Sequence, residues 1–117
     1  MKNYKKLKIW QKGMDIVAKT YKLAAQLPDE ERYGLRSQVT RCSVSIPSNI
    51  AEGSAKSSRK EYKNYLETSL GSAYELETQV LIMDMLEFGD KAVRSSLLGI
   101  LDEEQKMLQS FIQKIGE

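Results

Sequence analysis

The strongest constraint on the fold is a long, regular apolar stripe between residues 58 and 86. Apolar or small residues recur there at alternating spacings of four and three: Tyr62, Leu66, Ser69, Ala73, Leu76, Val80 and Met83. This spacing puts them on one face of a helix, and its persistence is typical of helices packed in a left-handed bundle. Ser58 and Glu61 form a capping box at its start. We therefore expect one long helix that buries this face against other helices.

Three further segments show helical periodicity. Their stripes are Leu7, Trp10, Met14, Val17, Tyr21 and Ala24 in residues 7–26; Leu35, Val39, Cys42, Ile46 and Ile50 in residues 32–52; and Leu97, Leu101, Leu108, Phe111 and Ile115, interrupted by Glu104, in residues 90–115, where Asp90 is the expected N-cap. The connections are short, which makes consecutive helices antiparallel neighbours. The sequence thus predicts an all-α protein, an antiparallel up-and-down four-helix bundle forming a single domain over residues 1–117.

Three residues refine this expectation. Pro47 lies inside the second helical segment, where it removes a backbone donor, so the helix either breaks or kinks. We predict a kink near Pro47, because the neighbouring serines and Asn49 can satisfy the freed backbone groups. Gly53 is expected to cap the end of this helix, and Gly71 is expected to let a neighbouring helix approach closely.

The sequence shows no recognisable catalytic motif. The sequence has no histidine, the commonest general base and metal ligand, and its glycines form no phosphate-binding loop. The one cysteine, Cys42, lies on an apolar stripe and is better explained as a buried side chain than as a reactive thiol. We predict a protein without enzymatic activity, cofactor or metal. No apolar run is long enough to span a membrane and no signal peptide is visible, so a cytoplasmic location is expected.

The distribution of charge suggests a binding surface. Residues 1–26 carry seven lysines against the single acidic residue Asp15, whereas the remaining residues carry eleven basic and fifteen acidic groups. The lysines are offset from the predicted apolar stripe and should face outward. The candidate nucleic-acid-binding residues are Lys5, Lys8, Lys12, Lys19, Lys22, Arg36 and Arg41, with further basic residues at Arg32, Lys56, Arg59, Lys60 and Lys63. A lysine stripe that merely solvates a helix is the alternative.

Several runs resemble a bacterial family of four-helix bundles, the 23S rRNA intervening-sequence proteins. These runs are Leu7-Lys8-Ile9-Trp10-Gln11, Leu27-Pro28, Glu31, Tyr33-Gly34-Leu35, Gln38, Arg41, Ser45-Ile46-Pro47-Ser48-Asn49-Ile50-Ala51-Glu52-Gly53, Tyr65-Leu66 and Gly71-Ser72-Ala73-Tyr74-Glu75-Leu76-Glu77. The resemblance implies a homopentamer of antiparallel bundles with no known enzymatic activity. A related branch, the accessory variability protein of diversity-generating retroelements, is strongly basic and binds nucleic acid, whereas this chain has a net charge of only +2.

The resemblance therefore favours an oligomeric module associated with RNA or DNA. The alternative is a structural or adaptor protein that binds another protein through the bundle surface, without nucleic acid. Under either alternative, we expect no membrane partner. The resemblance also suggests a polar contact between the second and third helices made by Asn49, Glu52, Gly71, Ser72 and Glu75, or else a binding pocket formed by the same residues.

Overall fold

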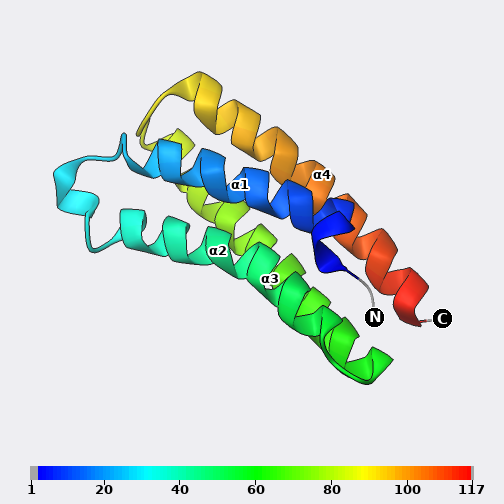
Figure 1. Cartoon of the computed structure of the whole chain (residues 1–117). Helices are drawn as coiled ribbons and strands as arrows, with labels where there is room; N and C mark the ends of the chain where they lie inside the picture. The colour runs from blue at the N-terminus through cyan, green and yellow to red at the C-terminus, as the bar shows by residue number, and fades with distance from the viewer. Residues whose placement is uncertain (1–2, 117) are drawn as a thin grey trace.

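The protein is an antiparallel four-helix bundle, as the computed structural model of residues 3–116 shows (Figure 1). The elements in chain order are the 3-10 helix η1 (Tyr4–Lys6), α1 (Lys8–Ala24), the 3-10 helix η2 (Asp29–Glu31), α2 (Leu35–Ser54), α3 (Arg59–Met85) and α4 (Lys91–Gly116). Each long helix packs against the next one along the chain, and α4 closes the bundle by packing against α1. The described part of the molecule measures 44 × 24 × 20 Å. The fold predicted from the sequence is confirmed.

The stripes predicted for α2 and α3 form the core. In α2, Val39, Cys42, Ile46 and Ile50 are buried, and in α3 every predicted residue from Leu66 to Met83 is buried while Tyr62 is half-buried. α4 contributes Leu97, Leu101 and Leu108, together with Ile112, which was not predicted. Phe111 and Ile115 pack against the core from a partly buried position.

The stripe predicted for α1 is only partly right: Ala24 is buried, and Leu7 and Trp10 pack against the core from partly buried positions, but most of the buried face consists of other residues. Besides Ala24, the buried residues of α1 are Ile9, Gly13, Ile16, Thr20 and Leu23, of which Ile16 and Leu23 are almost completely buried. Met14 and Tyr21 of the predicted stripe are 45% and 51% exposed. Both sets follow alternating spacings of three and four, so α1 has two apolar stripes side by side, and only tertiary packing selects between them. Apart from Ala24, the second stripe stays exposed or only partly buried.

Pro47 does not break α2, which continues as one helix from Leu35 to Ser54. Pro47 is buried, and the Ser69 hydroxyl of α3 donates to the carbonyl of Ile46 at 2.8 Å. A polar side chain thus bonds the backbone beside the proline, as expected, but this side chain, Ser69, belongs to α3 and not to α2. A kink at this position stays a prediction.

Neither of the two glycines of interest has the role expected for it, and the residue that caps the end of α2 is Ala55. Gly53 is buried inside the last turn of α2, and a Cβ placed there would lie 2.7 Å from Cβ of Tyr65. Gly71 is exposed, and within residues 3–116 no atom beyond its chain neighbours and the surrounding backbone of its own helix lies within 4 Å of the corresponding position. Gly53 therefore permits the close approach of α2 and α3, and the role assigned to Gly71 is corrected.

Side-chain caps fix the ends of α3 and α4. The Glu61 amide donates to the Ser58 hydroxyl at 3.1 Å, and Asp90 accepts from the amides of Ala92 and Val93, as predicted for both N-caps. Arg94 is almost fully buried and bonds the carbonyls of Phe88 and Gly89 as well as Asp84. These contacts fix the α3–α4 turn, so that α4 folds back along α3.

Candidate nucleic-acid interface

The lysines of α1 flank the core instead of lying opposite to it. Lys12 and Lys19 lie four residues before and three residues after the buried Ile16, on the side of α1 that faces α4, and both are partly buried. The Lys12 amine is 2.7 Å from Oε1 of Glu103 on α4. Lys5, Lys8 and Lys22 are exposed. The outward-facing stripe that we predicted from sequence is therefore corrected to a band along the α1–α4 boundary.

A stronger concentration of charge appears at one end of the bundle. The start of α1, the turn between α2 and α3 and the end of α4 lie together there, as Figure 1 shows. We define the basic end as residues 3–12, 47–66 and 104–116, which carry ten basic and three acidic side chains. Two of the ten, Lys12 and Lys106, form ion pairs with Glu103 and Asp102 at the border of this end. Residues 13–46 and 67–103 carry seven basic and twelve acidic ones. The bundle thus separates its charges along its length, which is not visible in the net charge.

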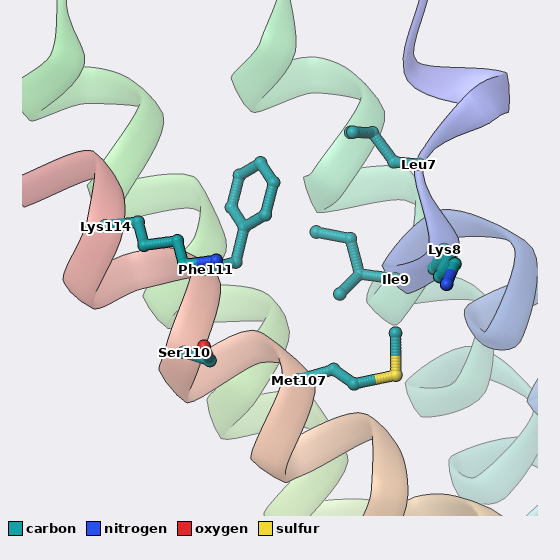
Figure 2. A pocket seen from close by; sticks show the side chains of 7 residues that line it. All are labelled: Leu7, Lys8, Ile9, Met107, Ser110, Phe111 and Lys114. Atoms are coloured by element: carbon teal, nitrogen blue, oxygen red, sulfur yellow. The ribbon is translucent and has the colours of Figure 1, made fainter.

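A shallow groove of about 210 Å³ lies at the basic end between α1 and α4. Figure 2 shows Leu7 and Ile9 on one side and Met107 and Phe111 on the other, pointing toward a common space, with Lys8 and Lys114 at its margin. Phe111 also packs edge-on against Tyr62 of α3, with ring centroids 6.0 Å apart. The groove therefore combines an apolar floor with exposed amines, a combination that suits a sugar or base next to a phosphate.

Arg36 and Arg41 lie away from the basic end. Arg36 donates to the carbonyl of Leu27 at 2.7 Å and so ties the start of α2 to the segment after α1. Arg41 is exposed and donates to the hydroxyl of Ser37 at 3.2 Å. Neither residue extends the cluster of lysines, and Arg41 belongs to a different hollow, between α2 and α3.

Polar side chains do connect α2 and α3, but only some of the predicted ones take part. The hydroxyls of Ser45 and Ser72 lie 2.8 Å apart, and the Asn49 amide donates to the Ser45 hydroxyl. The Cys42 thiol donates to the carbonyl of Ser72 at 3.1 Å. Glu52 and Glu75 are exposed at the surface.

Beside this contact lies a polar hollow of about 430 Å³, which we call the α2–α3 cleft. Its lining residues are Tyr33, Ser37, Gln38, Arg41, Cys42, Ser45, Ser72 and Glu75. Burial, together with the nearby carboxylate of Glu75, raises the pKa of the Cys42 thiol to about 12, so the thiol is a poor nucleophile near neutral pH. The sequence placed Arg41 and Glu75 in separate groups, and the structure brings them to one cleft.

The sequence also pointed to a buried carboxyl group without giving it a role. Glu104 is fully buried, and neither of its oxygens has a hydrogen-bond partner among the residues that the structure describes. Its carboxyl group lies where α4 meets α1 and α2, since a Cβ on Gly13 would lie 3.3 Å both from Oε2 of Glu104 and from Pro47. Burial raises the pKa of Glu104 to about 8, although Lys12 opposes the rise. The signal in the sequence was an acidic residue inside an apolar stripe.

The fold and the charged end define a helical bundle with a surface suited to binding. Residues 5–110 match the family model of the 23S rRNA-intervening sequence protein, and the chain belongs to this family. It is also similar to the crystal structure of a protein of unknown function from the S23 ribosomal protein family of Bacteroides thetaiotaomicron VPI-5482. That likeness has a TM-score of 0.82 and 24% identity over 90% of this chain and 95% of the other, and it concerns the fold. No curated protein matches.

The helices give no indication of a membrane-spanning segment. Over the described residues, none of them combines the length and the hydrophobicity that crossing a bilayer requires.

Proposed function

We propose that the protein is a non-catalytic, oligomeric module of the cytoplasm that binds RNA or DNA through its basic end. The observation that carries the proposal is the clustering of ten basic side chains against three acidic ones at this end. Phosphate binding requires several cations within reach of one backbone, and it does not require a shaped pocket. The basic end meets this requirement with side chains from all four helices or their connections.

Association of several copies supports such binding. A homopentamer is the assembly implied by the family resemblance, and a ring would repeat the basic end several times, which raises affinity through multivalency. Large apolar side chains are exposed on α1, α2 and α3, among them Met14, Val44 and Leu81. Exposed apolar surfaces of this kind commonly mark protein contacts. A sedimentation-equilibrium experiment at micromolar concentration should therefore give a mass several times 13.3 kDa, and a monomer would contradict the oligomer.

A salt titration of binding tests the nucleic-acid function. The nucleotide sequence of the probe should have little effect on the affinity. The logarithm of the affinity for duplex should fall linearly with the logarithm of the salt concentration, with a slope of about −0.9 per phosphate neutralised. Changing Lys8, Lys60 and Lys114 together to Gln removes exposed charges from three helices of the basic end. This variant should bind more weakly and show a flatter slope.

A matched variant separates the position of the charges from their number. Lys22, Arg32 and Lys91 are exposed and lie outside the basic end, so changing them to Gln removes the same formal charge. Affinity should fall much less in this control. Equal losses in the two triple variants would show that only net charge matters, and absence of binding at roughly 50 mM salt would refute nucleic-acid binding.

An adaptor that binds another protein is the second candidate. It is favoured by an apolar groove of about 340 Å³ between α1 and α2, lined by Tyr4, Trp10, Met14, Val17, Val44, Pro47, Ser48 and Ala51. On the α1 side, this groove is formed by Trp10, Met14 and Val17 of the second apolar stripe, which are not among the buried core residues. An oligomer without salt-dependent affinity for nucleic acid would favour this alternative.

A further inference from the structure

The residues of the α2–α3 cleft are not explained by the packing of the core. Six of its eight lining residues belong to the runs through which the sequence resembles its family: Tyr33, Gln38, Arg41, Ser45, Ser72 and Glu75. None of these six is buried. Side chains at the surface contribute little to the core, so their gathering around one hollow points to binding.

Two opposite charges stand on the two helices that form the cleft. Arg41 comes from α2 and Glu75 from α3, and both side chains line the same space. Within residues 3–116, neither forms an ion pair with a protein group. Arg41 makes one bond to Ser37, and Glu75 accepts one long bond of 3.3 Å from Gln79. Most of the five donors of the guanidinium and most of the acceptor sites of the carboxylate are therefore free for a ligand.

We propose that the α2–α3 cleft binds a guanine base. Guanine carries two adjacent N–H donors, at N1 and N2, and two adjacent acceptors, O6 and N7. A carboxylate can accept from the two donors and a guanidinium can donate to the two acceptors, each in a bidentate pair. Adenine, cytosine and uracil each place an acceptor beside their donor, so a carboxylate facing that edge would meet a repelling lone pair.

The remaining lining residues suit the same ligand. Tyr33 is 89% exposed, and the Arg32 guanidinium lies over one face of its ring at 5.8 Å, which leaves the other face for stacking on a base. Gln38 adds an exposed amide, and the Ser45 and Ser72 hydroxyls lie deeper, where they bond each other. The volume of about 430 Å³ falls within the range of small-molecule sites, which is about 300–1,000 Å³.

This proposal is independent of nucleic-acid binding by the basic end. The guanine base could belong to a free nucleotide or to single-stranded RNA, because the cleft would contact the base in either case. Isothermal titration calorimetry with guanosine 5′-monophosphate and with a guanine-containing RNA oligomer distinguishes the two sources. An oligomer of the same length without guanine serves as the control.

Base analogues test the individual contacts. Guanosine 5′-monophosphate should bind at least about fivefold more tightly than adenosine 5′-monophosphate, because one bidentate pair discriminates against the wrong base by at least this factor. Inosine 5′-monophosphate lacks the N2 donors, and the 7-deaza analogue of guanosine 5′-monophosphate lacks the N7 acceptor. Each of these two analogues should bind more weakly than the parent nucleotide.

Two cleft variants and one control complete the experiment. Glu75→Gln should weaken guanine binding and abolish the preference for guanine over inosine, and Arg41→Gln should abolish the preference over the 7-deaza analogue. Glu67→Gln removes an exposed carboxylate of α3 that does not line the cleft, and it should change nothing. Circular dichroism and the unfolding midpoint confirm that each variant is folded.

The outcomes distinguish this site from the basic end. The triple change of Lys8, Lys60 and Lys114 should leave the binding of guanosine 5′-monophosphate unchanged, even if it abolishes binding of duplex. The proposal is overturned if adenine binds as tightly as guanine, or if neither the nucleotide nor the guanine-containing RNA binds in a way that depends on Glu75. Free glycine is a zwitterion and could pair with Arg41 and Glu75 by charge alone. If glycine bound more tightly than guanosine 5′-monophosphate, the proposal would be overturned as well.

Discussion

Polar side chains lie between helices in two regions of the bundle, and the two regions differ in whether these side chains are hydrogen-bonded. Between α2 and α3, the hydroxyls of Ser45 and Ser72 bond each other and the Ser69 hydroxyl bonds the backbone of α2. Where α4 meets α1 and α2, the carboxyl group of Glu104 is fully buried without a protein partner among the described residues. Small hydroxyls can pair at a close helix contact, whereas a lone carboxyl group can be buried cheaply only when it is protonated. The first region should thus be insensitive to pH and the second sensitive.

The largest expected effect concerns Glu104. Its pKa is about 8 in the folded protein against an ordinary value of 4.5, so the folded state keeps a proton that the unfolded chain releases. The contribution of Glu104 to the free energy of unfolding should therefore be greatest below pH 4.5. As the pH rises from 4.5 toward 8, the free energy of unfolding should fall by at most about 1.4 kcal/mol per pH unit. Glu104→Gln should flatten this dependence in urea denaturation between pH 5 and pH 8 (roughly the window of the two values).

The neighbouring residue offers a control for this experiment. Glu103 carries the same group but its side chain is 62% exposed and pairs with Lys12. Glu103→Gln should keep the pH dependence of the wild type. If the slopes of wild type and Glu104→Gln were parallel, Glu104 would be ionised in the folded state and the contrast between the two regions would disappear.

The next effect tests how tightly α2 and α3 are packed. Gly53→Ala introduces a Cβ 2.7 Å from Cβ of Tyr65 and 3.0 Å from the ring of Tyr62, so the helices must move apart. We expect a loss of about 1–3 kcal/mol in the free energy of unfolding. Gly71→Ala on the exposed side of α3 should instead gain up to about 1 kcal/mol through helix propensity. Chemical denaturation of both variants measures these changes in the free energy of unfolding. Losses of equal size in the two variants would mean that Gly53 is not at a close contact.

A smaller effect concerns the hydroxyl pair itself. Ser72→Ala removes one partner, while Ser45 keeps its bond from Asn49. The free energy of unfolding should fall by about 1 kcal/mol, and by the same amount at pH 5 and pH 8. A double-mutant cycle with Ser45→Ala measures the coupling, which should be favourable. Additive losses would show that the two hydroxyls do not bond each other.

The smallest effect should leave stability untouched. The Cys42 thiol is 7% exposed with a pKa of about 12, so modification by Ellman's reagent at pH 8 should be slow in the folded protein and fast in urea. Rapid modification of the folded protein would show that the α2–α3 contact opens frequently.

The sequence was most informative where only one apolar stripe exists. The stripes of α2 and α3 are unambiguous, and every core residue predicted from Leu66 to Met83 is buried. α1 has two stripes with the same periodicity, and spacing cannot tell that Ile9 and Ile16 face the core while Met14 faces solvent. The position of the lysines was misjudged for the same reason, because it was measured from the wrong stripe.

The candidate sites depend on contacts between helices, which spacing along one helix does not contain. Gly53 and Gly71 are both glycines in helices, and only the position of Tyr65 makes the first one essential. Likewise, Arg41 and Glu75 are separated by more than thirty residues, and they share a cleft because α2 and α3 are antiparallel neighbours. The basic end arises in the same way, from the meeting of three distant segments.

The separation of charge gives the molecule an electric dipole along its 44 Å axis. A charged polymer exerts a torque on such a dipole, so a copy that approaches a polyanion is turned with its basic end forward before any contact forms. A larger share of collisions is then productive, and the acidic remainder of the bundle is held away from the polymer. Added salt shortens the range of this torque, and association should slow before the bound complex itself is weakened appreciably.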